Sequence, residues 1–596
     1  MSTTLDLVAI GRVSVDLYGQ QVGSRLEDIA SFSKAIGGSP ANVAIGAARL
    51  GLKAALITRV GDEPMGRFVR EQLEREGVGT RAVHTDPERL TSLVLLSVRD
   101  AETFPLIFYR ENCADSALDE GDIDAELIGA ARATLVTGTH FSLPAGARAQ
   151  RKAIEVARSL GRKVVLDIDY RPNLWGLGGH DAGDTRYERS AAVTAALASV
   201  LPSCDLIVGT EEEIHIAAGH EDTLEAMRRI RAVSGAVIVL KRGARGCVLF
   251  AERIPARLED ALVAPGLDVE VYNVLGAGDA FLAGFLLGYL RDAPHAVSLR
   301  LANACGAIAV SRLMCSVEFA TLAELTHYLA RGSRHHALRR DPQLAHLHWA
   351  TTRRAAPGTL FILDAAAVSA ELGRLMVEAA AQVAATRGGV GVRLGSTTDI
   401  SALRTAQREQ LWIAQAVEVA GERPLEFVPG PSFAARLIEW PSGITVSCRF
   451  EVRAEDEPPM HAAQERNLRR LAAACRAQGR ELLLEIAGAA SPATVLRLYE
   501  IGIRPDWWAL GAADEGGALE ASAQVVSVQD EYCHGVLTSS AAAASPVVRG
   551  FIAGGSIFTG VVTAWLAGRA SDESLIREIA DLFQAQIAAW LQARDA

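Results

Sequence analysis

The chain has 596 residues, too many for one hydrophobic core, so we expect at least two domains. Apolar residues make up 49% of it and charged residues 22%, which excludes a largely disordered or fibrous chain. The formal net charge of −11 argues against a general nucleic-acid binder, although a local basic pocket for a small anion stays open.

Signals for a membrane or an oxidising compartment are missing from the sequence. Asp6 interrupts the apolar core that a signal peptide would need. The longest uncharged stretch, residues 550–568, contains five glycines and predicts a buried turn and helix instead of a membrane span. The eight cysteines are scattered without a Cys-x-x-Cys pair, so we expect neither a zinc site nor a disulfide framework. We therefore expect a soluble cytoplasmic protein with no membrane and no nucleic-acid partner.

From residue 5 to about 330 the pattern alternates strand and helix. The predicted strands are aliphatic or β-branched at nearly every position, which is typical of a mostly parallel sheet covered by helices on both faces. Two segments, 13–32 and 92–108, alternate apolar and polar residues and predict a small lid sheet with one open face. The predicted buried strands are 5–11, 53–61, 133–138, 163–169, 206–209, 236–243 and 246–250, and the first two helices are 40–50 and 65–76.

Residues 336–357 are rich in Arg and His and separate two periodic regions, so we expect a solvated linker with a short helix. A nucleic-acid patch is the weaker alternative, because aromatic residues to stack bases are nearly absent. The expected domains are therefore 1–335 and 358–596. In the second, about eight strand–helix units predict a (β/α)8 barrel. The candidate barrel strands are 359–365, 389–394, 425–428, 444–450, 481–486, 507–510, 523–528 and 550–555.

The sharpest motif is the turn Gly276-Ala277-Gly278-Asp279, which precedes an apolar, small-residue helix. Two glycines around a small residue let successive backbone N–H groups point inward at a helix N-terminus, where a phosphoryl group would be stabilised. Asp279 in the first turn could take a proton from an attacking hydroxyl. The alternative is a glycine-rich helix entry with a capping Asp.

Two motifs resemble the signatures of the ribokinase-like (pfkB-type) carbohydrate kinases, over about residues 5–330. The first is Gly37-Gly38-Ser39-Pro40-Ala41-Asn42-Val43-Ala44, and the second is the segment 273–281, which contains the Gly276 turn. They follow in the family's order, about 235 residues apart. The resemblance implies a three-layer α/β domain with a small β lid, ATP and Mg²⁺ as cofactors, and Asp279 as the catalytic base beside Gly276, Ala277 and Gly278. Lid strands of the family often pair between subunits, which leaves a homo-oligomer open.

By this resemblance, Asp16, Gly38 and Asn42 bind the hydroxyls of a sugar-like substrate; from the residues alone, Asp16 could equally be a turn cap and Asn42 a helix cap. Glu213 matches the acidic end of the family's Asn-x-x-Glu motif, which organises magnesium and phosphates. Thr210 replaces the Asn of that motif, which puts the metal shell in doubt. On the nucleotide side, the resemblance implies contacts from Lys241, Gly243 and Asn303.

Two arginines point to an acidic sugar. Arg171 follows a buried strand, at the end where open α/β sheets bind ligands, and Arg110 ends a lid strand. Arginine pairs with a carboxylate through two hydrogen bonds, so a sugar acid is favoured over a neutral hexose. Alternatively, both arginines pair with Asp167, Asp169 or Glu111 for structural reasons.

The segment 167–176 resembles the branch of the family that phosphorylates the 6-hydroxyl of 5-dehydro-2-deoxy-D-gluconate in myo-inositol catabolism. The alternatives are a kinase for 2-keto-3-deoxygluconate or fructose, and a sugar-acid sensor without turnover. A sensor does not need the base of the intact Gly276–Asp279 turn, which argues against that reading.

The second half resembles a domain related to class I aldolases that is often fused behind this kinase. An aldolase of that class needs a lysine to form an imine, yet no lysine follows Lys241. Ser447 and Ala509 stand where the resemblance implies lysines. We therefore expect a degenerate barrel with a structural or regulatory role, with a metal-dependent route as the alternative.

Overall fold

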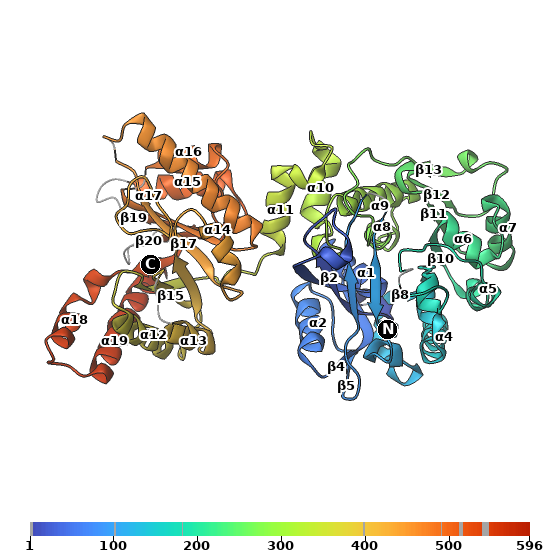
Figure 1. Ribbon diagram of the computed structural model, residues 1–596, viewed down its shortest axis with the longest axis horizontal. Helices are drawn as coiled ribbons and strands as arrows, with labels where there is room; N and C mark the ends of the chain where they lie inside the picture. The colour runs from blue at the N-terminus through green and yellow to red at the C-terminus, as the bar shows by residue number, and fades with distance from the viewer. Residues whose placement is uncertain are drawn as a thin grey trace. The chain divides into compact units, whose positions relative to one another are not determined.

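The computed structural model describes residues 4–100, 103–180, 183–396, 400–453, 455–489, 491–511, 517–538 and 547–595, and the chain forms two compact units, Met1–Thr352 and Arg353–Ala596. Each unit has its own strands and helices, as Figure 1 shows, and its own hydrophobic core. The segment 336–357, expected to be a linker, contains a 3-10 turn at Leu338–Arg340 and helix α11 (Pro342–Thr352). This helix is the last element of unit 1.

Unit 1 is built around a nine-stranded sheet in the order β13-β12-β11-β10-β9-β8-β1-β4-β5. All pairs are parallel except β11–β12 and β12–β13, which form an antiparallel edge. The first strand of the chain therefore lies between β8 and β4, well inside the sheet. The strands are β1 (Leu5–Ile10), β4 (Ala54–Gly61), β5 (Val83–Asp86), β8 (Ala131–Thr137), β9 (Lys163–Asp167), β10 (Leu206–Thr210), β11 (Val237–Lys241), β12 (Cys247–Phe250) and β13 (Leu262–Ala264).

Helices cover both faces of this sheet, because its strands are apolar at successive positions. Leu7 and Ala9 of β1 belong to one core with α1, α2, α8 and α9, whereas Val8 and Ile10 belong to a second core with α3–α7. This confirms the predicted three-layer α/β architecture. The helices are α1 (Ser39–Arg49), α2 (Pro64–Arg75), α3 (Ala125–Ala130), α4 (Pro144–Ser159), α5 (Ala191–Ala198), α6 (Glu211–Ala218), α7 (Thr223–Val233), α8 (Ala277–Tyr289), α9 (His295–Val310), α10 (Leu322–Arg331) and α11 (Pro342–Thr352).

The predicted lid is a four-stranded sheet in the order β3-β2-β6-β7. Strands β2 and β6 and most of β7 come from the two segments whose apolar and polar residues alternate, as predicted. Strand β3 begins at the last residue of the first segment and extends beyond it. Its strands are β2 (Ser14–Gly19), β3 (Phe32–Gly37), β6 (Leu93–Leu96) and β7 (Leu106–Tyr109).

Unit 2 is a closed barrel of eight parallel strands, β14 to β21 in chain order, as the sequence predicts. Helices α12 (Ala370–Ala384), α13 (Ile400–Arg408), α14 (Phe433–Arg436), α15 (Pro458–Ala477), α16 (Pro492–Glu500), α17 (Ala518–Gln529), α18 (Thr559–Leu566) and α19 (Asp572–Asp595) belong to it. The strands are β14 (Leu360–Ala365), β15 (Val390–Leu394), β16 (Trp412–Ala416), β17 (Thr445–Glu451), β18 (Leu482–Ala489), β19 (Trp507–Gly511), β20 (Gly535–Thr538) and β21 (Val548–Ala553).

Two of the eight predicted barrel strands are wrong. The segment 425–428 is flanked by Pro424 and Pro429 and makes only an isolated bridge, between Phe427 and Glu418. The segment 523–528 lies in α17, which buries one face with a helical period. The strands that take their places are β16, whose apolar run is broken by a Gln, and β20, which has only four residues.

Among the residues that the structure describes, no helix is both long and apolar enough to cross a membrane.

Candidate active site

Polar side chains gather at the carboxyl edge of the unit 1 sheet, where α8 begins. Asp167 ends β9, Thr210 ends β10 and Lys241 ends β11, so parallel pairing brings all three to one edge. Arg12 follows β1 and His140 follows β8 at the same edge. Ligands of open α/β sheets bind at this edge, and most of the predicted site residues lie near it.

The turn before α8 has the geometry of an anion site. Gly276 is the N-cap residue with φ +74°, a left-handed conformation that other residues adopt at a cost. A Cβ built on Gly276 would lie 2.6 Å from Sγ of Cys315, so there is also no room for a side chain. Gly276, Ala277 and Gly278 thus present the positive end of a 13-residue helix.

Asp279 lies in the first turn of α8 and keeps a solvent-accessible edge. Its Oδ2 accepts a hydrogen bond of 2.8 Å from Nδ2 of Asn42. Burial, reinforced by the nearby Asp169 carboxylate, raises the pKa of Asp279 to about 6. A carboxylate with that pKa is ionised at neutral pH and is still basic enough to accept a proton.

Asn42 is oriented by the way α1 begins. Gly38 is the N-cap residue of α1 with φ +99°, and a Cβ there would collide with the backbone carbonyl of Arg12. The helix starts at Ser39, so Asn42 lies inside it and is not its cap. Asn42 is 4% exposed, and its Oδ1 has no hydrogen-bond partner, which leaves it free to bind a ligand.

Lys241 is a buried charge and not an exposed strand end. Its Nζ lies 3.2 Å from Oδ1 of Asp167 and 3.5 Å from Oε2 of Glu213. Burial alone would lower the pKa of Lys241, but these two carboxylates outweigh it and raise the pKa. A Cβ built on Gly278 would lie 3.2 Å from the same Nζ, so the ammonium group faces the α8 turn.

Glu213 is a buried carboxylate at the start of α6. With Thr210 it forms the capping box of α6, since Thr210 N donates to Oε2 at 2.7 Å and Glu213 N donates to Thr210 Oγ1 at 3.2 Å. Oε1 accepts from Tyr170 N at 3.3 Å. Burial would raise the pKa of Glu213, but Lys241 outweighs it and the pKa is lowered. Thr210 thus fixes the carboxylate as a permanent anion at the sheet edge.

Asp16 is a buried carboxylate on the lid strand β2. Its Oδ1 accepts a hydrogen bond of 2.7 Å from Ser14 Oγ, and its carboxylate packs against Gly37, where a Cβ would collide with it. Burial raises the pKa of Asp16 and Arg12 opposes the rise. Asp16 therefore lies close to Arg12, as a buried group that could accept hydrogen bonds from hydroxyls.

Arg12 and two further basic side chains, His140 and Arg110, have unused hydrogen-bonding capacity. Arg110 is 8% exposed and bonds Asp115 through Nε at 2.7 Å, while its Nη2 has no partner. Nε of Arg12 and both ring nitrogens of His140 are also buried without a partner. Burial, with Arg110 and Arg12 nearby, lowers the pKa of His140 to about 3, so the imidazole is neutral.

Arg171 lies beside a second arginine that the sequence analysis missed. Burial and, above all, Arg171 lower the pKa of Arg186 to about 9, which shows the two guanidinium groups to be close. Arg171 itself donates to the carbonyl of Tyr170 at 3.4 Å. Between these groups lies Asp169, with φ +35° and a buried Oδ2 that has no partner. Arg110 thus pairs with Asp115 and not with the acids expected, whereas Arg171 acts on Asp169.

The residues missed by sequence reasoning are Arg12, His140 and Arg186. Arg12 and His140 each follow a predicted strand directly, a position that alone could have marked them. Arg186 lies in a stretch without helix or strand, and no sequence signal pointed to it.

Gly243 and Asn303 lie further along the sheet. Gly243 has φ +55° and opens the 3-10 turn Gly243–Arg245 between β11 and β12. Nδ2 of Asn303 donates to the carbonyls of Ala264 and Pro265, at 3.2 and 2.8 Å, which ties α9 to the β13 edge. The predicted nucleotide contacts of both residues stay a prediction.

Neither Ser447 nor Ala509 of the barrel can form an imine, because neither is a lysine. The barrel does contain an ion-pair network. Arg393 of β15 is 3% exposed and pairs with Asp364 at 2.6 Å and with Glu485. Ser447 is fully buried and its Oγ has no partner.

Comparisons with known proteins also divide the chain into two parts. Residues 4–320 match the model of the pfkB family carbohydrate kinases, and residues 324–594 match a family described as an uncharacterized protein conserved in bacteria, DUF2090. The chain is 31% identical over 330 residues to 5-dehydro-2-deoxygluconokinase of Geobacillus kaustophilus (strain HTA426), covering 54% of this chain and 93% of that protein. It is 32% identical over 326 residues to 5-dehydro-2-deoxygluconokinase of Shouchella clausii (strain KSM-K16), covering 54% and 94%.

The chain is also similar to a solved structure, the PfkB protein from Polaromonas sp. JS666. The two are 27% identical, with a TM-score of 0.46, and the match covers 54% of this chain and 99% of that one.

Proposed function

Since the chain belongs to the pfkB family of carbohydrate kinases, we propose that its first unit transfers the γ-phosphoryl group of ATP to the 6-hydroxyl of 5-dehydro-2-deoxy-D-gluconate. The name of the relatives in Geobacillus and Shouchella, which match nearly their full length, supports this substrate. ATP as the phosphoryl donor supports a cytoplasmic site of action. The observation that carries the proposal is the set of buried, unpartnered polar atoms next to Asp279, namely Oδ1 of Asn42 and Oδ2 of Asp169.

In the proposed reaction, Asp279 takes the proton of the 6-hydroxyl while the hydroxyl oxygen attacks the γ-phosphorus. The bond from the γ-phosphorus to the β,γ-bridging oxygen breaks, and ADP leaves with that oxygen. Asn42 holds Oδ2 of Asp279 in place through the 2.8 Å hydrogen bond. The backbone N–H groups of the Gly276 turn and the ammonium of Lys241 stabilise the charge on the transferred group.

The residues at the sheet edge fit Mg²⁺ held by phosphates and one carboxylate. Glu213 is ionised and 6% exposed, and each of its oxygens has a lone pair beyond the backbone hydrogen bond it accepts. We propose that it holds the metal through bound water. Mg²⁺ supplies charge neutralisation on the β- and γ-phosphates.

The polar side chains of the site suit a polyol that carries one carboxylate. Asp16, Asn42 and Asp169 offer oxygens to hydroxyls, whereas Arg12 and Arg110 offer unused N–H donors to an anion. An uncompensated buried donor is costly, so a ligand that satisfies these donors is favoured over one that lacks a carboxylate. Other sugar acids such as 2-keto-3-deoxygluconate are the nearest alternative, followed by fructose and by sensing without turnover.

The test is ADP formation by the full-length protein with Mg–ATP and a panel of compounds. The panel contains 5-dehydro-2-deoxygluconate, 2-keto-3-deoxygluconate, fructose, ribose and adenosine. Turnover selective for the first compound supports the proposal. Preference for another member keeps the reaction and discards this substrate, and no turnover with any of them contradicts the proposal.

The rate is expected to fall in acid because Asp279 must be ionised. With its pKa raised to about 6, kcat/KM is expected to be level above that pH and to fall about tenfold for each unit below it. The measurement is a profile of kcat/KM against pH at saturating Mg–ATP. A flat profile across the pKa of Asp279 would exclude it as the base.

Arg171→Ala is expected to raise KM for the sugar acid by about ten- to a hundredfold, the value of one charge-assisted hydrogen bond. The effect on an analogue whose carboxylate is reduced to an alcohol is expected to be small. Arg189→Ala, at an exposed position nearby, is the matched control. An equal rise for the acid and the neutral analogue would show that Arg171 is structural.

For the second unit we propose a role without imine chemistry, either structural or regulatory. The absence of lysine after Lys241 supports this, together with the buried pairing of Arg393.

A further inference from the structure

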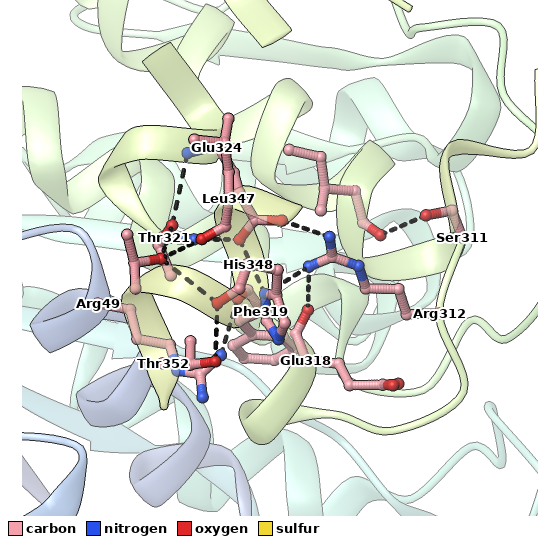
Figure 2. A network of polar contacts seen from close by, with 12 residues as sticks. Arg49, Ser311, Arg312, Glu318, Phe319, Thr321, Glu324, Leu347, His348 and Thr352 are labelled. Carbon is pink, nitrogen blue, oxygen red and sulfur yellow. Dashed lines mark hydrogen bonds and ion pairs between the residues drawn. The ribbon is translucent and has the colours of Figure 1, made fainter. Parts of the chain in front are cut away.

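A buried network joins α10 and α11 at the end of unit 1, and Figure 2 shows it. Glu324 of α10 is fully buried and accepts hydrogen bonds from Nη2 of Arg312 and from the backbone of Thr321 at 2.9 Å. Its Oε2 also lies 2.8 Å from Nδ1 of His348, and the same Nδ1 lies 3.1 Å from Nη1 of Arg312. In the tautomer with the proton on Nδ1, the imidazole donates to Glu324. Burial would raise the pKa of Glu324, but Arg312 and His348 outweigh it and lower the pKa to about 2. The carboxylate is therefore a permanent anion that fixes both partners.

The same arginine holds the segment 314–319. Arg312 Nη1 donates to the carbonyl of Glu318 at 2.7 Å, and Arg49 Nη1 donates to the carbonyl of Phe319 at 3.0 Å. Oε2 of Glu318 closes the segment by accepting from Met314 N at 2.5 Å. Two guanidinium groups thus fix consecutive carbonyls of a segment that has only a short 3-10 turn, Ser316–Glu318, of its own.

The segment 314–319 packs against the Gly276 turn that precedes α8. A Cβ on Gly276 would lie 2.6 Å from Sγ of Cys315 and 3.2 Å from Cζ of Phe319, so both side chains pack directly against the turn. Phe319 also packs against α1, where a Cβ on Gly46 would lie 3.2 Å from its ring. A shift of this segment would therefore move the backbone N–H groups that face the phosphate.

The network crosses the boundary between the two family matches. Arg312 lies within the pfkB match, which ends at residue 320, whereas Glu324 and His348 lie within the second match, which begins at residue 324. Yet α10 and α11 belong to the first compact unit. The second match thus supplies residues that hold a part of the kinase site.

We propose that His348, acting through Glu324 and Arg312, is a positioning residue for phosphoryl transfer that fixes the segment beneath the Gly276 turn. This inference rests on the proposed function. A hydrogen-bond donor at the Nδ1 position of residue 348 orients the carboxylate of Glu324. That carboxylate orients Arg312, whose other nitrogen holds the Glu318 carbonyl.

The test uses the full chain with His348→Leu, which keeps bulk but removes the donor, and His348→Asn, which keeps a donor near the Nδ1 position. His335→Ala, at an exposed histidine before α11, is the matched control. His348→Leu is expected to lower kcat by about ten- to a hundredfold and to weaken Mg–ATP binding, because small displacements at a reacting centre cost that much. KM for the sugar acid is expected to change little, and His348→Asn to recover most of kcat.

Binding of Mg–ATP is measured by calorimetry alongside turnover, so that the two proposals fail separately. Weaker Mg–ATP binding by His348→Leu in a protein that turns over no sugar would keep this inference and remove the proposed substrate. Unchanged kcat and unchanged Mg–ATP binding in His348→Leu would overturn the inference, as would equal losses in His348→Asn and His348→Leu. If His348→Leu does not fold, Glu324→Gln takes its place, with the same expected loss and the same contradicting result.

Discussion

Asp279→Asn is expected to lower kcat by about 10³- to 10⁴-fold while the affinity for the sugar acid stays within a few-fold of the wild type. The amide has the size of the carboxylate and can still accept the hydrogen bond from Asn42 through its oxygen. It cannot accept the proton of the hydroxyl, nor does it carry the charge that orients that proton. The measurements are kcat from ADP formation and the dissociation constant of the sugar acid from calorimetry.

Asp268→Asn serves as the control for this substitution, because the Asp268 side chain is almost fully exposed and pairs only with His336 at the surface. It is expected to leave kcat unchanged. Near-normal turnover by Asp279→Asn would remove Asp279 from its role. Loss of sugar binding in proportion to the loss of turnover would make it a binding group only.

Lys241→Met is expected to lower kcat by about 10²- to 10³-fold and to raise KM for ATP. The ammonium lies between two buried carboxylates and the phosphate-facing turn, so its removal leaves Asp167 and Glu213 to repel the nucleotide. Breaking a buried ion pair is also expected to cost about 3–5 kcal/mol of stability. Thermal unfolding and kinetics are therefore measured together, well below the lowered Tm.

Lys53→Met, at an exposed position, is the matched control and is expected to change neither the kinetics nor the thermal stability. A stable Lys241→Met protein with normal KM for ATP and normal kcat would show that Lys241 stabilises the sheet edge without acting on the nucleotide. A loss of stability with normal kinetics would lead to the same conclusion.

The two glycine motifs were predictable because backbone geometry depends on local sequence. A positive φ and a lack of space for Cβ explain why Gly38 and Gly276 stand where they do. What a side chain contacts depends instead on segments far away in the chain. The burial of Lys241 between Asp167 and Glu213 follows from the order of the strands, which a single motif does not reveal.

The functional residues that sequence reasoning missed were missed for the same reason. Arg12 and His140 carry no motif of their own. Each could have been marked by its position after a predicted strand, but that they lie at neighbouring strand ends follows only from the pairing of β1 with β8. In the barrel, the number of strands was correctly predicted, but two of the eight were placed on the wrong segments. For 523–528 the reason is that a short apolar run does not distinguish a strand from a buried helix face. Closure of the barrel depends on the number and the length of its strands more than on the sequence of any one segment.

The hydrogen bond between Asn42 and Asp279 joins positions 237 residues apart. During synthesis, the strand β1 emerges first but pairs with β4 and β8, so the middle of the sheet waits for chain that is made later. Asp279, the proposed base, and Asn42 meet only after α8 has left the ribosome. A chain that stops before α8 lacks both Asp279 and the helix that completes one of the two cores of unit 1, so it is expected to have no phosphoryl-transfer activity.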